Sequence, residues 1–457
     1  MTRLRRTPST VARLGLGLRV LLDGWPAVWL HRVSPALATL LALAALPASA
    51  DDTSALPSTA QPGTEFRLRW DASSANPQGP LAAAHALWPA IAAPTPSAAV
   101  AEVELRQTLR GQALGQPLAL AVNLLAWHEQ PEASTGHSQA RVNELSASTE
   151  AGPWSLSAGK KILGWDVGYG FRPNDFVQQE QRRTLLSVTP EGRPLLQAEH
   201  FGADSASTVL WVNPQQLHAA DDRSRGAQES ALALRHYQRR GAADGFVFGR
   251  LAQRTGASLG AALAWVASDS LELHASARAL QRHDGWQLAP AAADRPLPGN
   301  PWQQTTLGPA QQWLLGGQWT GEAQQSLLVE AWHDSSTLSD DQWSAWARRN
   351  TALAGSPTPT MARAANLAWQ ATPLNTPNLR RDTLFVRLAW QPERWLLSLD
   401  ALLQPADQGH SLTAALQWQG ERLRLNASLR VYGGPANALL RQLPQQRVGV
   451  LAAHWAY

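Results

Sequence analysis

The chain has 457 residues and no cysteine, and only 16% of its residues are charged. The absence of cysteine excludes a disulfide framework, a thiolate metal site and a lipid anchor on cysteine. Residues 1–50 carry six of the 39 basic side chains and one of the 35 acidic ones. This leaves 33 basic and 34 acidic side chains in the remainder, without the basic face that nucleic-acid binding requires.

Residues 1–50 are predicted to be a secretory signal peptide. Arginines precede an apolar run at 36–46, and Ala-Ser-Ala at 48–50 fits a small-residue cleavage site before Asp51. The run is too short to cross a membrane as a helix. An inner-membrane anchor and a wrongly chosen start codon, with the true start upstream, are the alternatives.

Residues 51–457 are predicted to form a transmembrane antiparallel up-and-down β-barrel of the outer membrane of a Gram-negative bacterium. No apolar run of 18 or more residues occurs in them, and polar and apolar residues alternate along many segments. The clearest alternation lies at 65–70, 101–110, 270–282 and 421–432. Counting such segments gives about 16 to 18 strands, although a soluble β-sandwich would also alternate.

The predicted connections fall into two lengths, and we expect short turns in the periplasm and long loops outside. The short turns are expected at 189–193, 266–270, 319–323, 391–393 and 419–421. The long connections are expected at 213–228, 283–307 and 333–360, with 335–360 as a long extracellular loop. Residues 72–98 are rich in alanine and proline and are predicted to be loop.

One stretch of this assignment violates parity. Three candidate strands, 324–334, 361–372 and 381–390, lie between two turns that must be separated by an even number of strands. Either 342–354 contains a further strand, or one turn is misassigned. The same segment could instead form a short loop helix capped by Ser339.

The 21 tryptophans favour a membrane barrel, because indole prefers the headgroup region and many of them end apolar segments. Those that precede polar or turn residues are Trp127, Trp211, Trp319, Trp369, Trp390 and Trp418. Leu451, Ala453, Trp455 and Tyr457 share one face of a final strand that ends on an aromatic residue, like the assembly signal of outer-membrane proteins. The alternative places these tryptophans in the core of a soluble sheet.

The densest local motif is Gly-Trp-Asp-Val-Gly-Tyr-Gly-Phe-Arg-Pro-Asn-Asp-Phe at 164–176, just after the two lysines of the chain. Glycines among aromatic residues break the strand pattern and predict a loop that folds into the lumen and narrows it. The charges expected at this constriction are Lys160, Lys161, Asp166, Arg172 and Asp175. A strand end with a glycine turn is the alternative.

This motif resembles a segment of large Gram-negative barrels of the porin and alginate-export type. The run from Glu330 to His333, followed by Leu-Ser-Asp-Asp-Gln-Trp, resembles an outer loop of such proteins. The resemblance implies a passive or an export channel, with an anionic sugar polymer among the solutes it suggests.

The predicted lumen face is rich in arginine, which favours anions in a pore. These arginines are Arg67, Arg69, Arg106, Arg110, Arg278, Arg387, Arg422, Arg424 and Arg430. Glu102, Glu104 and Glu272 share this face, so a balanced lumen held by ion pairs is the alternative.

We therefore predict a monomeric or trimeric channel that passes small, in part anionic, solutes or exports a polysaccharide. Its expected partners are outer-membrane lipid and the barrel assembly machinery. The alternatives are a plugged barrel that serves as a structural or surface-polysaccharide assembly factor, and a rim hydrolase using the His-Asp neighbours at 283–284 or 333–334. No nucleophile–base set, phosphate loop or metal spacing is recognisable, so neither catalysis nor a cofactor is expected.

Overall fold

The computed structural model describes residues 63–91, 97–113, 115–132, 134–175, 177, 185–186, 189–213, 229–292 and 296–456. They all belong to the second of two compact units, Ala55–Tyr457. The predicted signal peptide, Tyr457 and residues 214–228 lie outside the described residues, so the predictions made for them stay predictions.

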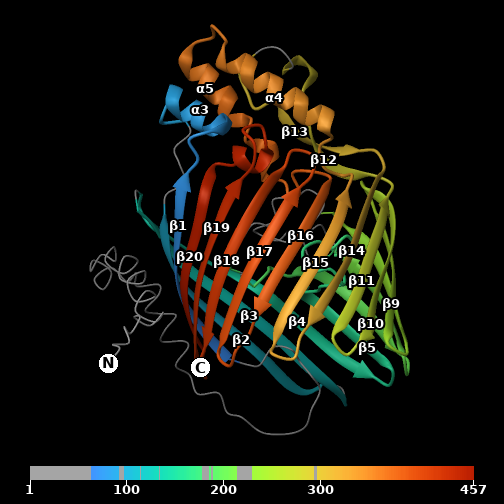
Figure 1. The fold of residues 1–457 in the computed structure, drawn as a ribbon. Helices are drawn as coiled ribbons and strands as arrows, with labels where there is room; N and C mark the ends of the chain where they lie inside the picture. Colours follow the sequence, from blue (N-terminus) through green and yellow to red (C-terminus); the bar gives the residue numbers. More distant parts are fainter. Residues whose placement is uncertain are drawn as a thin grey trace, which may run out of the picture. The chain divides into compact units, whose positions relative to one another are not determined.

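Eighteen strands form one antiparallel sheet that closes on itself, so the predicted barrel is confirmed at the upper end of the expected strand number (Figure 1). Each strand pairs with the next one along the chain, β11 pairs with β14, and β1 pairs with β20 to close the ring. The strands of the first half are β1 (Gly63–Ala75), β2 (Ala98–Ala113), β3 (Gln116–Pro131), β4 (His137–Ala151), β5 (Trp154–Lys161), β6 (Arg193–Phe201), β7 (Ser205–Val212), β8 (Ala231–Arg240) and β9 (Ala243–Ala252). The second half comprises β10 (Gly256–Ser268), β11 (Leu271–Leu280), β14 (Ala310–Thr320), β15 (Gln325–Asp334), β16 (Asp382–Trp390), β17 (Trp395–Gln404), β18 (Gly409–Gln419), β19 (Leu423–Gly433) and β20 (Gln445–Ala456).

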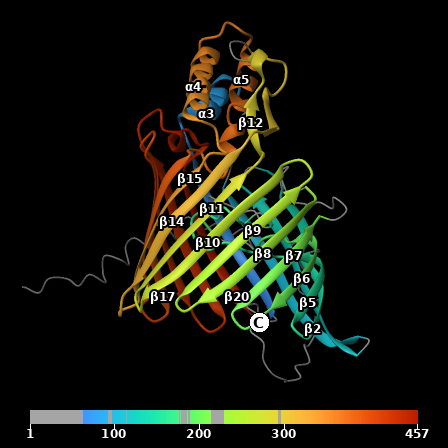
Figure 2. The ribbon, with the colours of Figure 1, turned by 90° about the vertical axis from the view of Figure 1, so that its right-hand side faces the viewer.

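The two rims of the barrel differ as predicted. Turns of two to four residues join the strands at the rim where β1 begins and β20 ends, whereas all of the long connections leave the opposite rim, together with the short ones after β9 and β17 (Figure 2). By the usual asymmetry of such barrels, the rim with tight turns is the periplasmic one. The predicted turn at 189–193 is wrong: β5 ends at Lys161 and β6 begins at Arg193, so these residues end a long connection.

The long connections build a cap with its own apolar core beyond the outer rim. It contains α3 (Gly79–Leu87), β12 (His283–Leu288), η2 (Pro290–Ala292), β13 (Trp302–Leu307), α4 (Asp340–Ala354), α5 (Thr360–Trp369), η3 (Thr372–Asn375) and η4 (Leu439–Gln442). None of the helices in the described part of the chain has the length and hydrophobicity needed to cross a membrane. The segment 72–98, expected to be loop, contains the end of β1, all of α3 and the first residue of β2.

The parity problem is resolved by helices. The segment 361–372 is α5 and part of η3 rather than a strand, so β15 and β16 are the two strands between the turns. The segment 342–354 lies within α4, whose Ser339 side chain accepts from the backbone N–H of Gln342 in a capping box. Trp369, predicted to end a strand, is instead the last residue of α5.

The alternation along each strand separates two environments. In β15, Leu328, Glu330 and Trp332 are buried, whereas Val329 between them is 39% exposed. Large apolar side chains cover the outer surface, and Leu259 on β10 is 70% exposed. Apolar exposure on this scale suits lipid rather than water. Exposed tryptophans near strand ends at the periplasmic rim are Trp154, Trp265, Trp319, Trp390, Trp395 and Trp455.

Candidate functional site

The candidate site is the connection between β5 and β6, of which residues 162–175 and 189–192 are continuously described. Gly159, near the end of β5, has a φ of +128°, a left-handed value that glycine adopts without strain. The chain leaves the sheet two residues later, and its next contacts are with side chains on the inner face of the barrel wall. This segment therefore folds toward the lumen, as the sequence predicts.

Two aromatic side chains anchor residues 162–175 to the wall. The Trp165 ring stacks on Phe248 of β9, with 6.3 Å between ring centroids, and both residues are buried. The Phe171 ring lies 5.8 Å from that of Trp332 on β15 and packs beside Leu314 of β14. The segment thus follows the inner surface from β9 to β15, covering apolar side chains that would otherwise face water.

A single carboxylate holds the backbone between these anchors. Glu330 of β15 accepts the Tyr169 N–H at 2.8 Å and the Gly170 N–H at 2.5 Å, and the His274 Nε2 lies 2.8 Å from its Oε1. The Glu330 side chain has no exposed surface. A Cβ on Gly170 would lie 2.8 Å from the Glu330 Oε2, so glycine permits this close approach.

A second carboxylate fixes the turn at 166–175. Asp166 accepts the backbone N–H of Asn174 at 2.6 Å and the Ser276 hydroxyl of β11 at 2.9 Å. The Asn174 side chain donates to the Ser276 Oγ and to the Ala277 carbonyl. Burial raises the pKa of the Asp166 carboxyl, and these donors oppose that effect because they favour the charged form.

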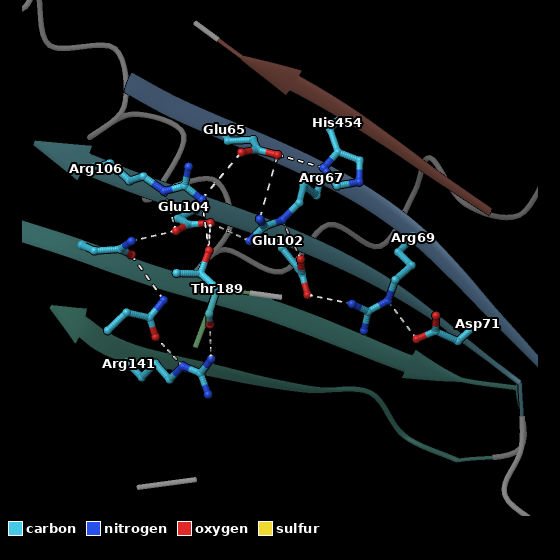
Figure 3. Close-up of polar contacts among 12 residues, drawn as sticks. Glu65, Arg67, Arg69, Asp71, Glu102, Glu104, Arg106, Arg141, Thr189 and His454 are labelled. Atoms are coloured by element: carbon cyan, nitrogen blue, oxygen red, sulfur yellow. Dashed lines mark hydrogen bonds and ion pairs between the residues drawn. The ribbon is translucent and has the colours of Figure 1, made fainter. Parts of the chain in front are cut away.

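The end of the connection contacts a different part of the wall. The Thr189 hydroxyl donates to the Glu104 Oε2 at 2.9 Å, and the Arg141 guanidinium donates to the Thr189 carbonyl at 3.1 Å (Figure 3). The Gly192 N–H donates to the Asn143 carbonyl of β4 at 2.8 Å. Residues 162–175 therefore lie against β9 to β15, whereas residues 189–192 lie against β2 to β4.

A dense ionic network covers the inner face where the barrel closes (Figure 3). Arg67 of β1 contacts the Glu102 Oε2 at 2.8 Å and the Glu104 Oε2 at 2.9 Å. Arg106 pairs with Glu104 at 2.8 Å, and His454 of β20 contacts Glu65 of β1 at 2.8 Å. Because Arg67, Glu102 and Glu104 are buried, their charges are satisfied mainly by one another.

The closed sheet, its apolar outer face and its charged inner face make this chain an outer-membrane-type β-barrel.

No protein-family model matches the chain. No curated protein matches it either. Among solved structures it is similar to a triple-mutant porin of Rhodopseudomonas blastica, with 7% identity over 87% of this chain and 99% of that chain and a TM-score of 0.40. It is also similar to Pseudomonas aeruginosa OccK8 (OprE), with 10% identity, 86% and 98% coverage and a TM-score of 0.48. For Acinetobacter baumannii OccAB3 the identity is 10%, the coverage 86% and 98%, and the TM-score 0.45.

The five charges predicted at the constriction do not form one cluster, and only Arg172 and Asp175 pair with each other among the described residues. Lys160 pairs with Glu191, and the Lys161 ammonium donates to Ser157 and Gln197 on the wall. Asp166 holds the turn described above. Arg172 donates to the Gly168 carbonyl at 2.8 Å and lies 3.7 Å from Asp175, so this pair stiffens the segment from within.

The predicted arginine lining divides into three kinds of environment. Arg67, Arg69, Arg106 and Arg387 lie within 4 Å of carboxylates, which supports the balanced alternative on their parts of the wall. Arg278 donates to Ser258 and to the Pro173 carbonyl, and Arg430 donates to Thr413 at 2.7 Å. The side chains of Arg110, Arg422 and Arg424 are exposed near the periplasmic rim and form no hydrogen bond or ion pair within the described ranges.

The His-Asp neighbours do not pair with each other. His283 lies beside the Gly308 carbonyl, while Asp284 pairs with Arg254. His333 contacts Asp382 at 2.7 Å, and the buried Asp334 accepts from Asn378 instead. Within the residues that the structure describes, no group of three or more potential ligands could hold a metal ion.

Sequence reasoning missed the most connected residue of the site. Glu330 entered only through a motif that resembles an outer loop, yet it lies within β15, as does His333. Alternation along β15 indicates that Glu330 shares the inner face with Leu328 and Trp332. Nothing in the sequence indicates that its carboxylate accepts from backbone 160 residues away.

Proposed function

We propose that this protein is an outer-membrane channel of a Gram-negative bacterium through which small solutes diffuse. One observation carries this proposal: the sheet is closed and apolar outside, and a fixed segment lies inside it against two separate parts of the wall. A segment so placed narrows a passage without requiring a separate plug domain. Charged side chains on the remaining inner face would select solutes by size and charge.

Export belongs to the same proposal. The signal peptide at 1–50 would direct the chain to the periplasm. The barrel assembly machinery would then insert it into the outer membrane with its tight turns facing the periplasm. N-terminal sequencing of protein recovered from outer membranes should start at Asp51. Outer-membrane lipid is the expected partner of the apolar surface.

Planar-bilayer recording tests the channel. Protein purified from outer membranes of cells expressing the full chain should give steady conductance steps. Reversal potentials in a salt gradient would then report whether the channel prefers anions or cations. The exposed Arg424, and Arg430 whose partner Thr413 is uncharged, should favour anions, whereas the arginines paired with carboxylates should favour neither sign. Export of an anionic polysaccharide would require a wide lumen. In that case, adding the polymer should block the current.

A plugged barrel is the second candidate, because the same connection touches both β2–β4 and β9–β15. Folded protein that inserts into bilayers but stays electrically silent would support a structural or assembly role. That result would reject the channel.

A further inference from the structure

A line of unlike charges crosses the inner face from β4 to β8 and differs from both the seam network and the inserted segment. We call it the β4–β8 belt, formed by Glu144, Lys161, Gln197, Glu199, Thr208 and Arg235. Gln197, Glu199 and Thr208 share β6 and β7 with Leu195 and Leu210, which belong to the buried apolar cluster around Trp165.

Neutral side chains separate the charges of the belt. The Lys161 ammonium donates to the Gln197 Oε1 at 3.1 Å, and the Gln197 amide donates to the Glu199 Oε2 at 3.2 Å. On the other side, the Thr208 hydroxyl donates to the Glu199 Oε1 at 2.8 Å, and Thr208 is the register partner of Arg235. Gln197 thus stands between Lys161 and Glu199, and Thr208 stands between Glu199 and Arg235.

Neither cation of the belt is paired directly with a carboxylate in the described part of the chain. Within the described residues, no carboxylate lies within 4 Å of Lys161 or Arg235, and the buried Nε of Arg235 has no hydrogen-bond acceptor. The Arg235 guanidinium lies over the Phe246 ring, 5.1 Å from its centroid. Among the described residues, the Glu144 carboxylate accepts a single hydrogen bond, at 3.3 Å from the Ser146 hydroxyl. By contrast, Arg67 at the seam touches two carboxylates.

The order of the charges around the wall is negative, positive, negative, positive, from Glu144 through Lys161 and Glu199 to Arg235. A wall of arginine alone would attract anions, and a wall of closed ion pairs would attract neither sign. Half-buried charges of both signs, separated by one neutral side chain and its hydrogen bonds, can each bind one end of a solute that carries both charges.

We propose that the β4–β8 belt is a binding site for zwitterionic solutes, such as ω-amino acids and short peptides. The solute carboxylate binds Lys161 or Arg235, and its ammonium group binds Glu199 or Glu144. This inference rests on the proposed channel for its biological role but not for its test, because binding can be measured without conduction.

Ligand-observed saturation-transfer NMR on the protein in detergent tests the belt. The probe is 4-aminobutanoate, with butanoate and butylammonium as probes of the same length that carry one charge. The zwitterion should bind more tightly than either. Glu199→Gln and Arg235→Gln should each weaken its binding about tenfold, the scale of losing one hydrogen bond to a charged group.

The controls separate charge from folding. Glu150→Gln, on β4 near the periplasmic turn, removes a carboxylate outside the belt and should leave binding unchanged. Lys161→Arg keeps the cation and should retain binding, and a change of migration in SDS gels between unheated and heated samples would confirm that each variant folds. Butanoate binding as tight as 4-aminobutanoate, or binding unaffected by Glu199→Gln, overturns the belt.

The belt and the channel fail separately. Conductance without zwitterion binding would reject the belt and leave the channel standing. Zwitterion binding lost in Glu199→Gln, in a protein that conducts no current, would support the belt and reject the channel.

Discussion

Two parts of the inner wall use buried carboxylates in different ways. At the seam, Arg67 and Arg69 of the neighbouring strand β1 pair with Glu102 from 35 and 33 residues away, and Arg67 also pairs with Glu104. At the β11–β15 wall, Glu330 of β15 accepts from the backbone of the inserted segment 161 residues away, and Asp166 of that segment accepts from Ser276 of β11, 110 residues away. The first arrangement closes the barrel, and the second shapes its interior.

The number of arginines on the inner face does not by itself determine which ions or solutes the lumen favours. Three arginines lie close together on the inner face at the seam, but each is within 4 Å of at least one carboxylate. They are Arg67, Arg69 and Arg106. Charges that can meet a solute are those held apart from opposite charges, as in the β4–β8 belt, or those exposed at the periplasmic rim.

Arg67→Leu should have the largest effect on stability, because it leaves Glu102 and Glu104 buried without their shared guanidinium. We expect a loss of about 3–5 kcal/mol, the usual result of removing one partner of a buried ion pair. Urea unfolding in lipid vesicles measures it. A loss below about 1 kcal/mol, the range of exposed pairs, would show that the seam network is not needed for closure.

Substitutions on the outer face of β19 measure the cost of placing a charge against lipid. Leu429 is 50% exposed near the middle of β19, so Leu429→Arg should cost about 2–4 kcal/mol, the depth-dependent penalty at the membrane midplane. Leu425 lies only two residues into the strand, so Leu425→Arg should cost about 0–1 kcal/mol. Equal costs at both positions would contradict a lipid boundary along β19.

Glu330→Gln should weaken the contact between β15 and the inserted segment. The amide keeps one acceptor oxygen for the N–H groups of Tyr169 and Gly170, so we expect a loss of about 1.5–3 kcal/mol, comparable with one hydrogen bond to a charged group. The segment should also loosen, which would appear as increased noise and altered size of single-channel currents. Glu272→Gln, on the neighbouring wall, is the control; currents identical to those of the unmodified protein in Glu330→Gln would argue against a fixed constriction.

Arg424→Ala should have the smallest effect on folding, within about 0.5 kcal/mol, because the side chain is exposed and has no partner among the described residues. Its effect should appear instead in the reversal potential, which should shift toward lower preference for anions. Arg69→Ala removes an arginine that is already paired and should shift it less. The opposite ranking would restore the paired arginines as the selective ones.

Much of the fold follows from patterns that the residues carry individually. Alternation in segments such as 421–432 predicts which side chains face lipid, and the exposure of Leu425 and Leu429 agrees with it. The capping box at Ser339 is readable as a motif, and α4 begins there. The strand predicted at 361–372 is wrong because a short run of apolar residues fits a strand and a helix equally well. Only the packing of these residues in the cap decides for a helix.

The sequence by itself therefore determined the class of fold and the two faces of each strand, because a period of two and an apolar outer face are local properties. It also marked 164–176 as a departure from the strand pattern. Only the tertiary structure decided which charges neutralise one another and which stay apart. Glu330, Asp166 and the β4–β8 belt depend on closure of the ring and on a segment crossing it, and neither leaves a fixed spacing along the chain.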